Sequence, residues 1–368
     1  MTTRILHLGS ATCPIHVHPN LLADAPAIIK SLGCFTRIFI AADSAILSTH
    51  AQTLASALTS AGITPYIHAI TAEESRKTFE QSSTLINFLL DHHCSRADLL
   101  IALGGGLLCD LAAFTASIFH RGIKLLLAPT TLLAMVDASI GGKTALNYPL
   151  PDHSLGKNIL GTFYPPLAII ADPLTLTTLP LQVFRAGLAE CVKHALLADP
   201  AHFTSLRENA AKILSQDPQT LSHLISTSIT IKSAIVEQDP LEHSIRAHLN
   251  LGHTFAHAIE LIPQLNLSHG YAVSIGLCAA AELSRLSAHL SPTHVASIQQ
   301  LLASFNLPTR LPASIPLSQL LTNMAHDKKS SHARLRFILL RDIAQPFISD
   351  NVSPDHLRSA LLFIGASE

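Results

Sequence analysis

The feature that most constrains the fold is an alternation of short apolar runs and helix-forming stretches over the first half of the chain. Five runs of strand length lie at residues 37–43, 64–70, 98–105, 124–131 and 167–173. Short apolar strands that alternate with helices form parallel sheets joined by right-handed crossovers. Ligands of such sheets bind at the carboxyl ends of the strands. The sequence therefore predicts an α/β fold, with a Rossmann-like parallel-sheet domain over residues 1–175.

The second half, residues 176–368, is dominated by helical periodicity. Apolar residues recur there at spacings of three and four, as on the buried face of a helix. One late β signal, ARLRFILL at 333–340, is followed by AQPFI and predicts a hairpin. We expect a mostly α-helical second domain that carries metal- and substrate-binding residues.

Composition narrows the class of protein. The chain is 48% hydrophobic and 13% charged, with a net charge of −1. A nearly neutral surface argues against nucleic acid or a membrane surface as a partner, and it favours an oligomer. Its six cysteines include no Cys-x-x-Cys pair, so we expect free thiols in a reducing compartment. Neither a signal-peptide core nor an apolar run of membrane-spanning length is present, which predicts a cytoplasmic protein.

Three consecutive glycines, Gly104 to Gly106, separate a strand from a helix in DLLIALGGGLLCDLAAF. Glycine lets the backbone approach a ligand closely, and the amino end of the following helix attracts anions. The pattern indicates a phosphate or pyrophosphate site, although a tight turn alone would also need glycine. Asp43, at the end of an earlier strand, is a candidate for binding ribose hydroxyls.

A histidine pair marks the helical half. His253 and His257 lie four residues apart in LNLGHTFAHAIE, so they share one helix face and could reach one ion. His269 and the carboxylate of Glu190 are further candidates. Two imidazoles, one carboxylate and an open position make a catalytic zinc site. Because the chain has 22 histidines, a chance pairing is the alternative.

Cations recur in regions that are otherwise apolar. Lys143 and Lys157 follow glycines in loop-like sequence, close to Asp137 and Asn158. Lysine is rarely buried without a partner, so an exposed surface position is the usual alternative for any single one. Together they indicate an anionic substrate with two charged ends. The cations of the second half are Lys193, Lys232, Arg246, Lys328 and Lys329.

Several motifs together resemble the 3-dehydroquinate synthase family over residues 30 to 340 or so. They are GGGLLCD, HRGIKLLLAPTTLLAMVDASIGGKTALN, LGKNILGTFYPP, AGLAECVKH, LNLGHTFAHAIE and LSHG. The resemblance implies an NAD- and metal-dependent lyase that converts 3-deoxy-D-arabino-heptulosonate 7-phosphate into 3-dehydroquinate and phosphate. It also implies a homodimer and one divalent ion, zinc or cobalt.

The resemblance assigns roles residue by residue. Glu190, His253 and His269 would be the metal ligands, which moves His257 to the substrate side. Arg121 would meet the substrate phosphate, offered by the partner subunit. The NAD contacts would be Asp43, Glu74, Lys77, Gly104, Gly105, Gly106, Leu107, Leu108, Cys109, Asp110, Thr130, Thr131, Lys143, Lys157, Thr175, Leu176, Thr177 and Thr178. The substrate contacts would be Asp137, Lys143, Asn158, Lys193, Lys232, Arg246, Asn250, His257 and either Lys328 or Lys329.

The sequence departs from the family pattern in several places. Cys109 stands where the family usually has glycine, and Tyr148 to Ser154 holds extra residues before LGKN. The other atypical residues are Gln182, Val183, Pro240, Ser244 and Tyr271. Three alternatives to the implied function remain. The alternatives are another sugar phosphate cyclase, a metal-dependent polyol dehydrogenase, and an inactive NAD-binding protein. Arg246, with Lys232 and Asn250, is the set implied to hold a carboxylate, and its presence favours the dehydroquinate reaction.

Overall fold

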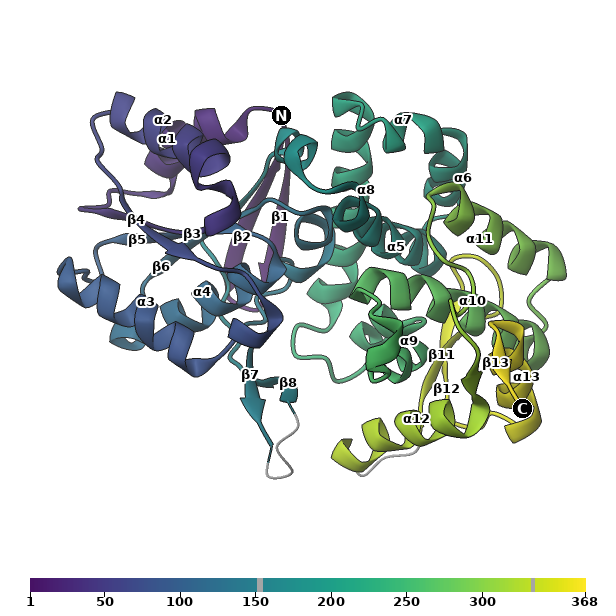
Figure 1. The fold of residues 1–368 in the computed structure, drawn as a ribbon. Coiled ribbons are helices and arrows are strands. Elements are labelled where there is room, and N and C mark those ends of the chain that lie inside the picture. The colour runs from purple at the N-terminus through teal and green to yellow at the C-terminus, as the bar shows by residue number, and fades with distance from the viewer. Residues whose placement is uncertain (151–154, 332–334) are drawn as a thin grey trace. The chain divides into compact units, whose positions relative to one another are not determined.

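The computed structural model of the chain describes residues 1–150, 155–331 and 335–368, without the side chains of residues 326–331. The chain forms two compact units. We call residues 1–179 and 221–240 the sheet unit, and residues 180–220 and 241–368 the helical unit. Figure 1 draws both, with labels on the helices and strands.

Seven strands form the sheet of the sheet unit, in the order β1-β2-β9-β6-β5-β3-β4. All neighbouring pairs are parallel except β1 with β2. The five apolar runs correspond to β3, β4, β5, β6 and β9, so the predicted parallel-sheet α/β fold is confirmed. The strands are β1 (Thr2–Leu8), β2 (Ala11–Val17), β3 (Ile38–Asp43), β4 (Tyr66–Ile70), β5 (Leu99–Gly104), β6 (Lys124–Pro129) and β9 (Ala168–Ala171).

Helices cover both faces of this sheet. Figure 1 shows α1 (Leu21–Leu32) and α2 (Gln52–Ser60) on one face, and α3 (Phe79–Asp91) and α4 (Gly106–Ile118) on the other. Every residue of β5 is buried, as expected of a central parallel strand covered on both sides. Side chains alternate between the two faces, and those of Leu99, Ile101 and Leu103 join the core cluster of α1 and α2.

A two-stranded hairpin and six short helical elements complete the sheet unit's loops. The hairpin pairs β7 (Leu146–Pro149) with β8 (Leu155–Leu160) in antiparallel register. Of the extra residues noted in the sequence, Tyr148 and Pro149 end β7, whereas 151–154 lie outside the described residues. The short elements are η1 (Ser44–Ile46), η2 (Leu47–Ala51), η3 (Glu74–Arg76), η4 (Phe119–Arg121), η5 (Ala134–Ala138) and η6 (Pro173–Thr178).

Helix α8 (Pro218–Gln238) lies in the half of the sequence that was expected to form the second domain, after residue 175. Most of it, residues 221–238, groups with the sheet unit rather than with the later helices. Polar contacts explain this grouping. Glu237 pairs with Arg4 of β1 at 2.6 Å and accepts the backbone N–H of His7 at 3.0 Å, and Lys232 pairs with Asp137 at 2.6 Å.

The helical unit is organised around α10 (His269–Ala288), which is buried along most of its length. It packs against α5, α9, α11 and α13. The predicted late hairpin is confirmed, because β11 (Phe337–Leu340) pairs antiparallel with β12 (Pro346–Ser349). The remaining elements are α5 (Leu181–Ala198), α6 (Pro200–Glu208), α7 (Ala210–Leu214), η7 (Ile245–Asn250), α9 (His253–Glu260), η8 (Pro263–Leu265), α11 (Pro292–Ser304), β10 (Ile315–Pro316), α12 (Leu317–Ser331), α13 (Pro354–Phe363) and β13 (Ala366–Ser367).

The length and hydropathy of the helices show whether any of them could cross a membrane. Within the described ranges, every helix is too short or too polar to cross a bilayer.

Candidate active site

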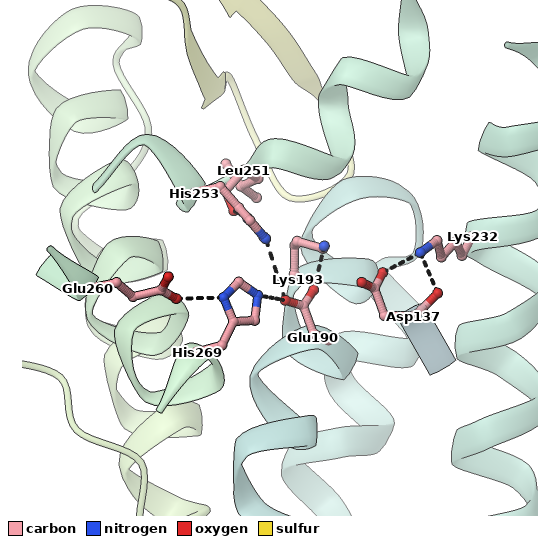
Figure 2. A network of polar contacts seen from close by, with 8 residues as sticks. All are labelled: Asp137, Glu190, Lys193, Lys232, Leu251, His253, Glu260 and His269. Atoms are coloured by element: carbon pink, nitrogen blue, oxygen red, sulfur yellow. Dashed lines mark hydrogen bonds and ion pairs between the residues drawn. The ribbon is translucent and has the colours of Figure 1, made fainter. Parts of the chain in front are cut away.

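Three predicted metal ligands meet in the helical unit, as Figure 2 shows. Glu190 comes from the middle of α5, while His253 and His269 are the first residues of α9 and α10. One potential ligand atom from each lies within 4.8 Å of the other two. The Nε2 atoms of His253 and His269 lie 3.6 and 3.5 Å from Glu190 Oε1. The structure thus brings together residues that are 79 positions apart at the extremes (269 − 190).

Glycines explain how the three helices come so close. A Cβ at Gly270 would overlap the backbone carbonyl of Ala186, one turn before Glu190 on α5. A Cβ at Gly276 would overlap the carbonyl of Gly252, next to His253. Because glycine lacks that atom, α10 lies directly against both neighbours. Gly270 and Gly276 of α10 therefore set the spacing of the candidate ligands.

Both imidazoles present Nε2 to Glu190 because their Nδ1 atoms are already used. Nδ1 of His253 lies 3.2 Å from the carbonyl of Leu251, and Nδ1 of His269 lies 2.6 Å from Glu260 Oε1 (Figure 2). A carbonyl can only accept, so the first contact requires a proton on Nδ1 of His253. An imidazole protonated at Nδ1 leaves the Nε2 lone pair available for a metal ion.

The electrostatics of the cluster also fit a cation. Glu190 is fully buried and forms an ion pair with Lys193, one turn along α5. Burial, with Lys193 nearby, lowers the pKa of His253 to about 3. Burial also acts to lower the pKa of His269, but the hydrogen bonds and charges of Glu190 and Glu260 outweigh it and raise that pKa to about 10. The two carboxylates that favour a positive charge on His269 also favour a divalent ion such as zinc, which would displace the proton from Nε2 and be held by one carboxylate and two imidazoles.

His257 lies apart from these ligands. It is exposed on α9, and its ring stands edge-on to that of His253 at 5.6 Å between centroids. The spacing of the histidine pair alone suggested that both would bind one ion, whereas His269 occupies the second imidazole position in the cluster.

Glu260 is a residue that the sequence interpretation missed. It lies seven residues after His253, two turns along the same helix face, which was the available signal. Replacing Glu260 with alanine removes the acceptor that orients His269, so we expect about 10- to 100-fold weaker metal binding. Competition with a metal chelator measures this. Glu282→Gln, which disturbs the ion pair with Arg285 on α10, is the matched control. Unchanged affinity in Glu260→Ala would contradict the orienting role.

The glycine loop lies at the carboxyl end of the sheet, as predicted. Gly104 ends β5, α4 begins at Gly106, and the amide of Thr130 donates to the carbonyl of Gly104 at 2.9 Å. A Cβ at Gly106 would come within 2.9 Å of Ala138 Cβ, so this position is sterically restricted to glycine. Asp43, at the end of β3, adjoins Gly104 and caps η1 through Ala45 N at 3.1 Å.

Around the loop lie the other predicted NAD residues. Thr131 accepts the amide of Ala134 at 3.2 Å. Leu107 is half-buried and Leu108 is fully buried in the first turn of α4. The segment Thr175 to Thr178, including Leu176 and Thr177, forms most of η6 after β9, and Thr178 Oγ1 lies 2.7 Å from His50 Nε2.

Cys109, the departure from the family's glycine, is buried in the first turn of α4. Its Sγ lies 3.8 Å from the carbonyl of Gly104, toward the strand end. Burial raises the pKa of the thiol well above its ordinary value. The side chain is therefore an uncharged part of the core.

Lys77, Asp110 and Asn158 form one polar network in the sheet unit. The Nζ atom of Lys77 lies 2.6 Å from both Asp110 Oδ2 and Asn158 Oδ1. Burial raises the pKa of Asp110, against the opposing effect of the Lys77 charge. The structure thus joins two predicted NAD residues to a predicted substrate residue.

A second ion pair joins Asp137 and Lys232. Lys232 Nζ lies 2.6 Å from the carboxylate Oδ1 of Asp137 and 2.6 Å from its backbone carbonyl (Figure 2). Both residues were predicted to contact substrate. The structure holds them together, with Lys232 almost fully buried.

The remaining predicted NAD and substrate residues differ in exposure. Lys143, Lys157 and Arg121 are exposed on the sheet unit, as are Glu74 and Asn158. Arg246 is buried in η7 of the helical unit, and Asn250 ends that element exposed. The side chains of Lys328 and Lys329 lie outside the described residues.

Comparisons with known proteins define the class. The model "3-dehydroquinate synthase N-terminal" matches residues 67–186, and "3-dehydroquinate synthase C-terminal" matches residues 187–330. The 3-dehydroquinate synthase of Pseudoalteromonas translucida is 38% identical over 97% of this chain and 98% of its own length. That of Paracoccus denitrificans is 39% identical over 96% of each chain.

Solved structures show the same architecture. The 2-epi-5-epi-valiolone synthase of Streptomyces hygroscopicus, with NAD⁺ and Zn²⁺ bound, matches with a TM-score of 0.87 and 27% identity over 98% of this chain and 99% of its own. A 2-deoxy-scyllo-inosose synthase matches with a TM-score of 0.86 and 24% identity over 98% of this chain and 99% of its own, which supports the fold alone.

The fold is therefore that of the sugar phosphate cyclases. Within that class, the chain belongs to the 3-dehydroquinate synthase family.

Proposed function

We propose that the chain is a 3-dehydroquinate synthase, which converts 3-deoxy-D-arabino-heptulosonate 7-phosphate into 3-dehydroquinate and phosphate in aromatic amino acid biosynthesis. The observation that carries the proposal is the convergence of Glu190, His253 and His269 in a chain with full-length relatives of that name. Offering the substrate to the purified protein and identifying dehydroquinate among the products tests it.

NAD and one divalent metal ion, zinc or cobalt, are the proposed cofactors. When bound, NAD reversibly accepts a hydride and the metal ion polarises the substrate oxygens. Glu190, His253 and His269 would hold the metal. The phosphates of NAD would lie on the amides of Gly105 and Gly106. The remaining contacts would come from Asp43, Glu74, Lys77, Asp110, Thr130, Thr131, Lys143, Lys157 and η6.

The chain's own polar residues would bind and orient the anionic substrate. Arginine presents a planar pair of donors that suits a carboxylate, and lysine presents a compact charge that suits a phosphate. We assign carboxylate binding to Arg246, with Lys232 and Asn250. The other proposed substrate contacts are Asp137, Lys143, Asn158, Lys193 and His257, with Lys328 or Lys329. Such fixed charges stabilise the substrate without reorganising during the reaction.

Oligomeric state and location complete the proposal. We expect a homodimer in which Arg121, exposed at the end of η4, meets the substrate phosphate of the partner subunit. We also expect a cytoplasmic enzyme, because all six cysteines are free and five of them are buried.

Another sugar phosphate cyclase activity is the competing function, favoured by the similarity to the valiolone synthase. Such enzymes act on sugar phosphates that lack the carboxylate. A side-by-side assay with the heptulosonate phosphate and with seven- and six-carbon sugar phosphates that lack a carboxylate separates the two functions. Phosphate release from the carboxylate-bearing substrate alone supports the proposal, and release from a sugar phosphate without a carboxylate alone would overturn it.

Removing the metal should abolish turnover reversibly. Because Glu190, His253 and His269 together could hold one divalent ion, a strong chelator should give inactive protein that regains activity with zinc or cobalt. Metal content before and after treatment is the accompanying measurement. Full activity in protein shown to be free of metal would contradict the assignment.

A further inference from the structure

Asn147 is a buried amide that the proposed function leaves without a role. It is 1% exposed and lies in β7, where the register with β8 shifts between Leu146 and Tyr148. Because of this irregularity, its backbone N–H donates to the carbonyl of Lys77 at 2.7 Å instead of joining the β7–β8 ladder. Such irregularities re-aim a side chain and occur often beside active sites.

The side chain of Asn147 makes three hydrogen bonds to two other segments. Its Nδ2 donates to the carbonyl of Glu74 at 3.1 Å and to Glu74 Oε1 at 2.7 Å. Its Oδ1 accepts the backbone N–H of Asn158 at 2.9 Å. A backbone N–H can only donate and a carbonyl can only accept, so these partners fix the orientation of the amide.

The bond to Asn158 acts on an unusual backbone. Asn158 has a φ of 57°, in the left-handed region that side chains other than glycine rarely adopt. Asparagine tolerates that region better than most residues, but it still needs support from its surroundings. Asn147 supplies that support by satisfying the Asn158 amide in the left-handed conformation.

Asn147 and Lys77 together close a ring of contacts. Lys77 follows η3 and bonds to Asn158 Oδ1 and to Asp110 on α4, while Asn147 bonds to Glu74 on η3 and to Asn158 on β8. The ring therefore fixes η3, the start of α4 and β8 relative to one another. Four of the proposed NAD and substrate contacts take part in this ring, namely Glu74, Lys77, Asp110 and Asn158.

We propose that Asn147 is a positioning residue for this reaction. It holds Asn158 in its left-handed conformation and η3 against the hairpin, so that Glu74, Lys77, Asp110 and Asn158 keep one arrangement. This inference rests on the proposed function for what those four residues bind. It does not depend on that function for the arrangement itself.

Two variants of Asn147 separate its contacts with Glu74 from its contact with Asn158. Asn147→Ala removes all three side-chain bonds, and we expect kcat/KM to fall about 100-fold because a small misplacement of binding groups is sufficient for such a loss. Asn147→Asp keeps the acceptor for Asn158 but places a negative charge beside Glu74. The variant loses both Nδ2 hydrogen bonds to Glu74, so we expect it to bind NAD about tenfold more weakly, while Asn158 keeps its positive φ.

Ser82→Ala is the matched control for stability. Ser82 is fully buried in the sheet unit and its hydroxyl lies 2.8 Å from Thr115 Oγ1, between α3 and α4. Its loss should lower the unfolding temperature while leaving the kinetic constants and NAD affinity unchanged. A merely structural role for Asn147 would give the same result in its variants.

The readouts are kcat and KM for the substrate, the Kd for NAD, and the φ of Asn158 in crystals of each variant. Unchanged kinetics and NAD affinity in Asn147→Ala would overturn the proposal. If Asn147→Ala does not fold, wild-type NAD affinity in Asn147→Asp would overturn it. If the wild-type protein makes no dehydroquinate, the proposed function fails, but NAD affinity and the Asn158 backbone still decide whether Asn147 positions these segments.

Discussion

Replacing Glu190 with glutamine should abolish metal binding and turnover together. Glu190 is fully buried, and its carboxylate faces Lys193 and the imidazoles of the two candidate ligands His253 and His269. Glutamine keeps the shape but removes the charge that balances a divalent ion. Because a catalytic metal contributes several kcal/mol to the transition state, we expect kcat/KM to fall at least about a thousandfold. Metal content of the purified variant and its steady-state rate are the measurements.

Stability must be measured in the same variant. Removing one partner of a buried ion pair costs about 3 to 5 kcal/mol, so the unfolding temperature of Glu190→Gln should also fall. Glu237→Gln is the control, because it breaks the pair with Arg4 at 2.6 Å in the other unit. That variant should keep its metal and its activity. A Glu190→Gln protein with full metal content would show that the ligands have been misassigned.

The second large effect is expected at Arg246. Its guanidinium is buried in η7, and we assign it to the substrate carboxylate. Replacing it with alanine should cost about 2 to 5 kcal/mol in kcat/KM, as for a desolvated charge contact whose partner is left unpaired. Arg246→Lys should recover only part of this loss, because lysine keeps the charge without the planar pair of donors.

Arg285→Ala is the control for Arg246. Arg285 belongs to the same unit but pairs with Glu282 at 2.7 Å, and its side chain is partly exposed. Its loss should leave the kinetic constants as they are. If Arg246→Ala kept the wild-type KM for the heptulosonate phosphate, its assignment to the carboxylate would be wrong.

The parallel sheet could be predicted from sequence because a buried strand is a short, continuous run of apolar residues. The β5 run DLLIALGG is apolar at successive positions, as a strand covered on both faces must be. The β1–β2 hairpin was not predicted. In β2, buried Cys13, Ile15 and Val17 alternate with less buried residues, but Pro14 interrupts the strand pattern, and β1 is largely exposed. The sheet-unit grouping of α8 was also missed, since it depends on Lys232 and Glu237 contacting residues far away in sequence.

In the candidate site, too, the residues that belong to sequence motifs could be predicted, and those that depend on tertiary contacts could not. The family motifs identified Glu190, His253 and His269, and the structure brings them together. The supporting residues Glu260 and Asn147 were not identified. Helical spacing from His253 placed Glu260 on the ligand face, but the partners of the two residues, His269, Glu74 and Asn158, come from other segments and are seen only in the folded chain. Long-range hydrogen bonds leave no periodic signal in sequence.

The central claim is that this chain uses NAD catalytically, with a metal ion, to release phosphate from 3-deoxy-D-arabino-heptulosonate 7-phosphate. The direct measurement is phosphate release by metal-loaded protein given less NAD than substrate, with NADH followed in the same sample. We predict many phosphates released per NAD, dehydroquinate as the product, and no accumulation of NADH. Absence of phosphate release from this substrate, or formation of one NADH for each substrate consumed, would contradict the account.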